Sequence, residues 1–259
     1  MFFDLQPEAV VLDCAAPLGV CFMAVKSDKC DRHRDIRWMT TRRIGAVFNA
    51  PLVSRFKSVI KRVPRGRIRV LDIGCGDGYL ACQIAKQRPD SQVTGIDSDL
   101  RGILIARQFA DAGGLKNVRF DLNQSDGLPF PPSSFDLVIM TDVIERLPEP
   151  QFMLAEMKRV LAPGGTAIVT TPNRHDGSKW DHRHGQNYTA EELRRELEHT
   201  LGPTKVIGSW HISYVRSWRR NRIGRFILDL SARLGRNAFD KEVENPSREY
   251  GQLTAVSRL

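Results

Sequence analysis

The chain has 259 residues, of which 41% are hydrophobic and 27% charged, a composition typical of a globular protein with one large domain. Its net charge of +9 favours an anionic partner, but no apolar run reaches the ~18–20 residues of a membrane span. The five cysteines include no CxxC pair, which argues against a disulfide scaffold and indicates free thiols in the cytoplasm. A zinc set of Cys14, Cys21, Cys30 and His33 is a weak alternative, because spacings of seven and nine residues do not match a zinc knuckle.

Residues 1–66 are predicted to form a basic N-terminal extension. Positive charge gathers in residues 26–69, which carry 14 Lys/Arg against three Asp, and again in residues 205–236, which carry eight against one acid. Either zone could bind an anionic partner or form a solvated basic face. Within the extension, residues 44–63 have the apolar spacing of a helix.

After residue 66, strand-like and helix-like segments alternate. Strands are predicted at 68–73, 92–97, 117–120, 135–141, 166–171, 205–212 and 252–257, and helices at 79–88, from a Ser98 cap to 113, at 150–161 and after a capping box at 189–192. This alternation, with continuously apolar strands, predicts an α/β fold with a Rossmann-like, doubly wound, mostly parallel sheet of seven strands. A ligand should then lie outside the carboxyl ends of the strands.

The first strand leads into "VLDIGCGDGYLA", Val70 to Ala81, with three glycines in five residues. Glycines permit a tight turn and close approach of a ligand, and amides at the following helix start favour an anionic group. These features suit NAD and S-adenosylmethionine equally. A dinucleotide fingerprint, however, requires a third glycine where this chain has Tyr79.

The pattern D-x-G-x-G-x-G from Asp72 to Gly78 resembles motif I of the class I S-adenosylmethionine-dependent methyltransferases. "DGLPFPPSSFDLVIMTDVIERLPEP" resembles the stretch of that family from the adenine loop through the fourth strand, and "MKRVLAPGGTAIVTTPN" resembles its fifth-strand turn. The closest likeness is to ubiquinone-biosynthesis O-methyltransferases and similar small-molecule enzymes. The resemblance implies a methyltransferase domain at 67–259, with a cofactor half at 67–147 and an acceptor half at 148–259.

The resemblance also implies a set of cofactor contacts. They are Asp72, Gly74, Cys75, Gly76, Gly78, Asp97, Ser98, Leu100, Gln124, Ser125, Asp126 and Thr141. Asp72 and the amides near Gly74 would meet the methionine end of S-adenosylmethionine, and Asp97 the ribose. Leu100 would pack on the adenine, or else belong to the helix core. Gln124, or alternatively Asp126, would reach the adenine edge, and Thr141 and Asp142 would border the sulfonium.

Two segments could supply chemistry to the acceptor. "TDVIERLP" resembles the "EVIEHL" segment of the ubiquinone-type group, where carboxylates and a His line the active-site mouth. Glu145 is therefore a candidate base, although it could also be a plain helix-start carboxylate. In that group these side chains can also bind a divalent cation. Because Arg146 stands here in place of the His, we expect no metal site. The loop 173–189 holds His182 and His184, either of which could be the base unless the loop is simply exposed.

Residues 216–236 are predicted to form one basic amphipathic helix inserted before the last strand. Its apolar positions are Ile223, Phe226, Ile227, Leu230 and Leu234, with arginines around them. This pattern is typical of an interfacial helix on an anionic membrane, and a lid over the acceptor is the alternative. Nucleic-acid binding is less favoured, because the chain lacks a recognisable RNA-binding module.

Together these features predict an enzyme that moves a methyl group from S-adenosylmethionine to a small-molecule or lipid- or glycan-linked acceptor, at a hydroxyl. The alternatives are an RNA or protein methyltransferase that uses the basic segments, and a non-catalytic relative that only binds the cofactor. The expected location is the cytoplasm, including the inner membrane face. The sequence does not indicate an oligomeric state.

Overall fold

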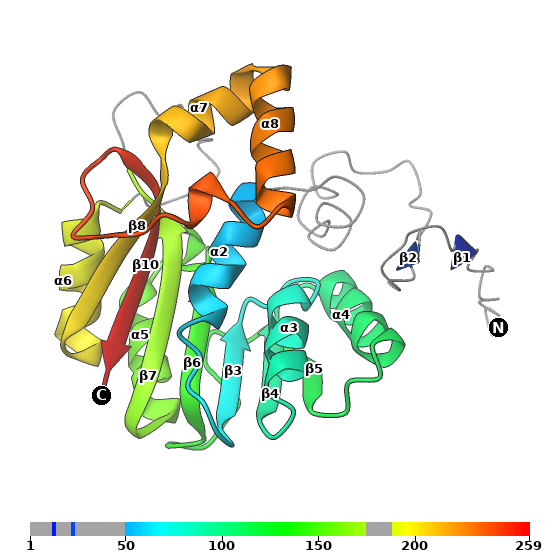
Figure 1. Cartoon of the computed structure of the whole chain (residues 1–259). Coiled ribbons are helices and arrows are strands. Elements are labelled where there is room, and N and C mark those ends of the chain that lie inside the picture. The colour runs from blue at the N-terminus through cyan, green and yellow to red at the C-terminus, as the bar shows by residue number, and fades with distance from the viewer. Residues whose placement is uncertain (1–11, 14–21, 24–49, 175–187) are drawn as a thin grey trace, which may run out of the picture.

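The computed structural model describes residues 12–13, 22–23, 50–174 and 188–259 (Figure 1). The zinc alternative falls outside these residues, as do His182 and His184. None of the helices within the described ranges combines the length and the apolar character needed to cross a membrane. Two short strands, β1 (Leu12–Asp13) and β2 (Phe22–Met23), pair with each other in an antiparallel manner.

A central sheet organises the remainder of the described chain. Its strands are β3 (Arg69–Ile73), β4 (Gln92–Asp97), β5 (Val118–Leu122), β6 (Phe135–Thr141), β7 (Leu161–Pro172), β8 (Thr204–His211), β9 (Val243–Glu244) and β10 (Tyr250–Arg258). Their order is β5-β4-β3-β6-β7-β10-β8-β9. The pairs from β5 to β7 are parallel, whereas β10 is antiparallel to both of its neighbours. This is the mostly parallel, doubly wound sheet that the sequence predicts, with the two-residue β9 as an additional edge strand on β8.

The helices follow the predicted alternation closely. They are α2 (Ala50–Ile60), α3 (Tyr79–Gln87), α4 (Leu100–Ala112), α5 (Pro150–Val160), α6 (Ala190–Leu201), α7 (Ile212–Arg220) and α8 (Arg222–Arg233), with 3-10 turns η1 (Ile144–Arg146) and η2 (Ala238–Asp240). The capping box of Thr189 and Glu192 is confirmed at the start of α6. The cap of α4 is Asp99 rather than the expected Ser98, because the Asp99 carboxylate accepts a hydrogen bond from the Arg101 amide at 2.8 Å.

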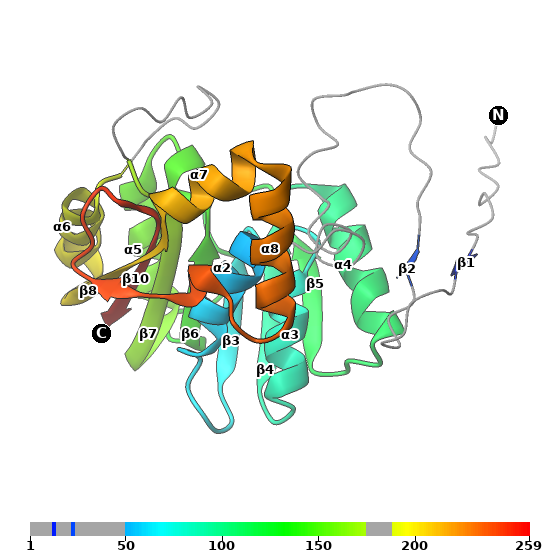
Figure 2. The same ribbon diagram turned by 45° about the horizontal axis from the view of Figure 1, so that its top comes forward.

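Two layers of helices cover the sheet, as Figures 1 and 2 show from two directions. Successive side chains of a strand point to opposite faces, so neighbours such as Val70 and Leu71 belong to different core clusters. Val70 packs with α2, α3 and α4, whereas Leu71 packs with α5 and α6. Both faces are therefore buried, which explains why the strands are continuously apolar.

The basic insert is two helices rather than the single helix expected for 216–236. The break falls at Asn221, whose φ and ψ of −120° and 114° are extended. Its side chain accepts a hydrogen bond from the Ile223 amide at 3.0 Å and so caps α8. The helix pair α7–α8 stands beyond the carboxyl ends of the strands, and α8 lies beside the first turn of α2 (Figures 1 and 2).

The strand order reverses between β3 and β6. From β3 the chain moves outward to β4 and β5, then returns to pair β6 on the other side of β3. In open parallel sheets, ligands bind outside the carboxyl ends of the strands at such a switch point. The segments that follow β3, β4 and β6 therefore define the candidate site.

Candidate active site

The glycine loop joins β3 to α3 through three residues in the left-handed backbone region. The φ angles of Gly74, Gly76 and Gly78 are 69°, 58° and 74°, values that other residues rarely adopt. A Cβ atom added at Gly74 would lie 2.4 Å from Cγ2 of Val143, and one at Gly78 would lie 2.7 Å from Cζ of Phe120. The loop is therefore packed against the segments that follow β6 and against β5, without room for side chains at these two positions.

The backbone amides of this loop donate hydrogen bonds to other groups of the protein. This corrects the expectation that the amides near Gly74 contact the cofactor. The amides of Gly74 and Cys75 both donate to the Ile96 carbonyl, at 2.8 and 3.0 Å. The Gly76 amide donates to Oδ2 of Asp97 at 2.9 Å. The amides near Gly74 are thus not available to a ligand, because they fasten the loop to the end of β4.

Asp97 lies at the end of β4 and accepts backbone hydrogen bonds on both carboxylate oxygens. Besides the Gly76 contact, Oδ1 accepts from the Asp99 amide at 2.9 Å. Burial raises the pKa of Asp97, and the backbone hydrogen bonds oppose that rise. Each oxygen keeps a second lone pair, so the oriented carboxylate has the chemistry to accept two hydroxyls of a ribose.

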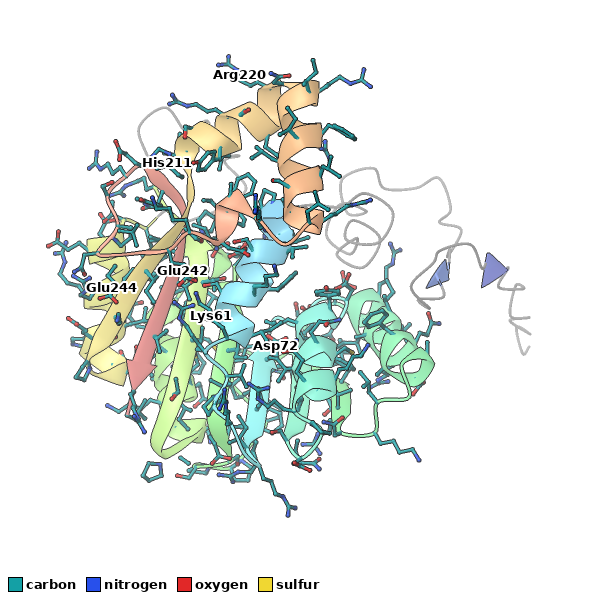
Figure 3. The ribbon with its side chains drawn as sticks, viewed as in Figure 1. Lys61, Asp72, His211, Arg220, Glu242 and Glu244 are labelled. Atoms are coloured by element: carbon teal, nitrogen blue, oxygen red, sulfur yellow. The ribbon has the colours of Figure 1, made fainter. Side chains whose placement is uncertain are left out.

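Asp72 is buried beneath the glycine loop, near the carboxyl end of β3 (Figure 3). Its side chain is 0% exposed, and neither carboxylate oxygen has a hydrogen-bond partner among the described residues. Burial, reinforced by the charge of Asp97, raises the pKa of Asp72 to about 8. Because a buried carboxylate without a partner is costly, this position fits a ligand that brings a positive charge, such as the ammonium of the expected cofactor.

The expected adenine side is formed by the start of α4 and the loop after β5. Leu100 is 51% exposed, so it does not belong to the helix core and offers an apolar surface. The Gln124 side-chain amide donates to the Ser98 carbonyl at 3.4 Å, which brings these two predicted residues together. Ser125 donates to the Gly127 carbonyl at 2.9 Å and shapes the turn. Asp126 is exposed, and the roles of these residues in binding adenine stay predictions.

Asp142 follows β6 and joins three separate parts of the chain. Its Oδ1 accepts hydrogen bonds from Thr170 Oγ1 and Gln252 Nε2, both at 2.9 Å, while Oδ2 pairs with the guanidinium of Arg55 on α2. The φ of Asp142 is 52°, a left-handed value that turns the chain sharply after Thr141. The sequence placed Asp142 beside the sulfonium but did not indicate Arg55 or Gln252.

Glu145 lies in η1 and is 2% exposed. Its Oε2 accepts a hydrogen bond from Thr171 Oγ1 at 3.0 Å, whereas Oε1 has no hydrogen-bond partner in the described part of the chain and lies 3.9 Å from Nε of Arg146. Burial, followed by the nearby charge of Asp142, raises the pKa of Glu145 to about 7. A carboxylate that titrates near neutrality with one available oxygen has the properties of a general base.

Buried acceptor atoms gather at this end of the sheet. Asn173 Nδ2 donates to the carbonyls of Ser247 and Tyr250, and Gln252 Nε2 donates to Asp142, so the orientation of both amides is fixed. Their oxygens, like Oε1 of Glu145, lack a hydrogen-bond partner within the described ranges. Asn173 directly follows β7, and Gln252 is the third residue of β10, the strand that pairs with β7. These oxygens favour a ligand that donates hydrogen bonds.

Two predicted bases cannot be compared with this geometry, because His182 and His184 lie outside the described residues. The residues that flank their loop are described. Tyr188 is 5% exposed and forms a backbone bridge with Asn173, which anchors the end of the loop beside the buried acceptor atoms. No group of three His, Cys, Asp or Glu side chains suited to a metal ion occurs within 50–174 and 188–259.

Comparison with known proteins places this site among methyltransferases. A family model described as a methyltransferase domain matches residues 65–211, which is more than half of the chain. The chain is 35% identical over 122 residues to demethylmenaquinone methyltransferase of Thermus thermophilus, covering 47% of this chain and 55% of that protein. It is 34% identical over 111 residues to ubiquinone biosynthesis O-methyltransferase of Rhizobium johnstonii, covering 43% and 44%.

Solved structures agree on the fold. A SAM-dependent methyltransferase from Aquifex aeolicus has a TM-score of 0.55 with 18% identity, over 78% of this chain and 88% of that one. At this identity the likeness concerns the fold alone. The sequence matches span about half the length of the curated relatives.

Proposed function

The chain belongs to the class I S-adenosylmethionine-dependent methyltransferases, and from this premise we propose that it methylates a hydroxyl of a small-molecule or lipid- or glycan-linked acceptor. The bound cofactor would supply a methyl group on a positively charged sulfur. The task of the protein is then to place the acceptor oxygen in line with that methyl group and to exclude water.

The proposed cofactor contacts follow the described geometry. Asp97 binds the ribose hydroxyls through its second lone pairs, and Asp72 provides the charge for the ammonium. Leu100 packs on the adenine, and Gln124 lies next to its edge. Gly74 and Gly78 allow the loop to keep this conformation, because a Cβ atom at either position would overlap Val143 or Phe120.

Glu145 is the proposed base. Its carboxylate is buried, and one of its oxygens has no hydrogen-bond partner among the described residues. This observation is the main support for a hydroxyl as the methyl acceptor. Oε1 of Glu145 would accept the proton of the acceptor hydroxyl, while bound S-adenosylmethionine would supply the methyl group and be left as S-adenosylhomocysteine. Thr171 holds Oε2 and so fixes the direction of the carboxylate. An amine acceptor would need no such base, only a neutral nitrogen.

The test is transfer of labelled methyl groups from S-adenosylmethionine into lipid, small-molecule, RNA and protein fractions of a cell extract. We expect label in the lipid or small-molecule fraction. Glu145→Gln should lower kcat by about 10²-fold or more, with unchanged cofactor affinity. Activity of the unaltered protein should rise with pH through about 7, where Glu145 loses its proton, and this rise should be absent in the variant.

Glu149→Gln is the matched control, because Glu149 is exposed and lies four residues further along the same segment. It should keep full activity. If Glu145→Gln also keeps full activity while His182→Ala or His184→Ala loses it, the base lies in the histidine loop instead. If calorimetry detects no binding of S-adenosylmethionine or S-adenosylhomocysteine, the whole proposal fails.

A second candidate function is methylation of RNA or protein, favoured by the 14 Lys/Arg in residues 26–69. The same labelling experiment decides between them, because label in the RNA or protein fraction would replace the small-molecule proposal. A non-catalytic relative would bind the cofactor but leave every fraction unlabelled.

A further inference from the structure

Helix α8 exposes an unusual amount of apolar surface. The exposed fractions are 71% for Ile223, 67% for Phe226, 58% for Ile227, 44% for Leu230 and 75% for Leu234. Positions spaced by three, four and seven residues lie on one face of a helix, so these side chains form a continuous stripe. We call this set the α8 stripe. An apolar stripe of this size on a protein surface marks an interaction site.

The stripe faces outward because the opposite side of α8 is fastened to the body of the protein. Asp229 Oδ1 accepts hydrogen bonds from Trp218 Nε1 at 2.9 Å and from the Ala50 amide at 3.2 Å. Ala232 is buried, and Leu228 packs against the small core around Phe239. These contacts fix the inner face of α8 to the rest of the protein. They therefore oppose any rotation of the helix that would bury the α8 stripe.

Cations surround the stripe. Residues 216–236 contain seven arginines and one acid, Asp229, which is engaged on the inner face. Arg220 and Arg222 are exposed at the junction of α7 and α8, and Arg233 and Arg236 are exposed at the far end of α8. Figure 3 shows Arg220 at the outer end of α7, away from the sheet. The surface thus combines an apolar stripe with positive charge at both ends.

This combination favours a lipid surface over a protein groove as the partner. An interfacial helix buries its apolar side chains at the headgroup boundary while its arginines meet anionic headgroups. Helix α8 stands beyond the carboxyl ends of the strands (Figure 1), and all five side chains of the stripe are at least 44% exposed. A protein partner with the same charge complementarity would need an acidic groove of matching shape.

The α8 stripe is also connected to the candidate active site. The Asp229 contact joins α8 to the Ala50 amide at the start of α2. Arg55, on the same helix, pairs with Asp142. Five residues of α-helix span about 7.5 Å. A surface on which α8 rests would therefore lie close to the side from which an acceptor enters.

We propose that α8 docks on an anionic lipid bilayer, with the α8 stripe inserted at the headgroup boundary and the neighbouring arginines on the headgroups. This surface is independent of the methyl-transfer chemistry, because docking requires neither cofactor nor acceptor. It would bring a lipid-linked acceptor, the finer part of the proposed function, to the open end of the sheet.

The experiment is co-sedimentation of the full chain with vesicles of phosphatidylcholine alone or with about a third of phosphatidylglycerol. We expect binding to the anionic vesicles and weak binding to the neutral ones, with loss at high salt. Phe226→Asp combined with Leu230→Asp should weaken binding at least about ten-fold. Replacing Arg220 and Arg222 by Gln should weaken it roughly five-fold for each arginine.

The matched control is Phe152→Asp combined with Leu104→Asp, a Phe and a Leu exposed to 47% and 48% on α5 and α4. This pair should bind vesicles as the unaltered chain does, and circular dichroism and cofactor affinity should match in all variants. Binding that survives the Phe226 and Leu230 changes, or no binding of the unaltered chain, overturns the proposal. A dimer in gel filtration that these two changes dissociate, without vesicle binding, would instead assign the stripe to a second copy of the chain.

Discussion

At the end of β3 the two ligand-facing carboxylates, Asp72 and Asp97, lie on adjacent strands and are 25 positions apart in the sequence, whereas at the end of β6 the groups come from three distant parts of the chain. Residues 72–78 and Asp97 form the first region, and the loop amides hold it to β4. The second region depends on Arg55 and Gln252, which are 197 positions apart in the sequence and meet only at Asp142. The cofactor region is therefore a local motif, while the acceptor region exists only after the whole sheet has formed.

Gly78→Ala should have the largest effect, and it tests how far the local motif depends on backbone shape. The new Cβ would lie 2.6 Å from Cβ of Ala106 and 2.7 Å from Phe120, at a φ of 74°. Left-handed strain and overpacking together should cost about 2–4 kcal/mol of unfolding free energy. Cofactor affinity should fall at least about ten-fold, measured by calorimetry.

Gly114→Ala provides the comparison, because Gly114 has a similar φ of 62° with nothing within 4 Å of the added Cβ. It should cost only about 1 kcal/mol and leave cofactor affinity unchanged. Equal losses for both variants would show that the packing around Gly78 does not matter, and that the loop is less constrained than its neighbours suggest.

Asp97→Ala should come next. The substitution removes the hydrogen-bond acceptor of the Gly76 amide and also the proposed contact with the ribose. The binding free energy of the cofactor should therefore weaken by roughly 2–3 kcal/mol. Calorimetry with S-adenosylhomocysteine measures the loss. Asp121→Ala is a suitable control, since Asp121 lies half-exposed on the adjacent β5. A normal affinity of Asp97→Ala would remove Asp97 from the cofactor site.

Arg55→Met tests the distant region. Both partners of its ion pair have side chains that are 16% exposed, and losing one leaves Asp142 with a largely buried charge, so we expect about 1–3 kcal/mol of destabilisation. Methyl transfer should fall while cofactor affinity stays within two-fold, roughly the precision of the assay. In a double-mutant cycle with Asp142→Asn the losses should be less than additive. Additive losses, or a loss of cofactor affinity, would contradict the division between the two regions.

The pH dependence of stability tests the two regions through their carboxyl groups. Asp72 and Glu145 have native pKa values of about 8 and about 7, both raised above their ordinary values by burial. The folded chain therefore binds more protons than the unfolded chain between about pH 4 and 8, and its unfolding free energy falls as the pH rises through this range.

Urea unfolding at pH 5, 6, 7 and 8 measures this decline. Glu145→Gln should reduce it below pH 7, by about 1 kcal/mol or more, and Asp72→Asn should reduce it up to pH 8. A protein whose stability is constant across this range would show that neither carboxyl group is as buried as described.

The glycine loop and the two carboxylates beside it could be located from sequence because they are close together in the chain. Asp72, the glycines and Asp97 lie within 26 consecutive residues that form β3, the glycine loop, α3 and β4, so their pattern can be recognised without knowledge of the fold. Leu100 illustrates the limit, because helix periodicity allowed either a core residue or an exposed one, and the structure gives 51% exposure. The loop amides were mistaken for ligand contacts, since their partner, the Ile96 carbonyl, belongs to another strand.

The acceptor region could not be predicted in the same way. Nothing local marks Arg55 among the many basic residues of its segment, and Gln252 looks like any other polar residue of a strand. The break between α7 and α8 had one available signal, Asn221, a residue that favours helix caps. The amphipathic pattern continued across it. The Trp218–Asp229 hydrogen bond and the Arg225 guanidinium over the Trp218 ring show how the two helices fold onto each other.

The buried carboxyl group of Asp72 has a consequence for the heat of cofactor binding. With a pKa of about 8, it holds its proton in the free protein at neutral pH. An ammonium group seated beside it would displace that proton into the solvent, so binding becomes an exchange of one cation for another. The enthalpy recorded by calorimetry would then vary with the ionisation enthalpy of the buffer, while the net charge of the pocket stays constant.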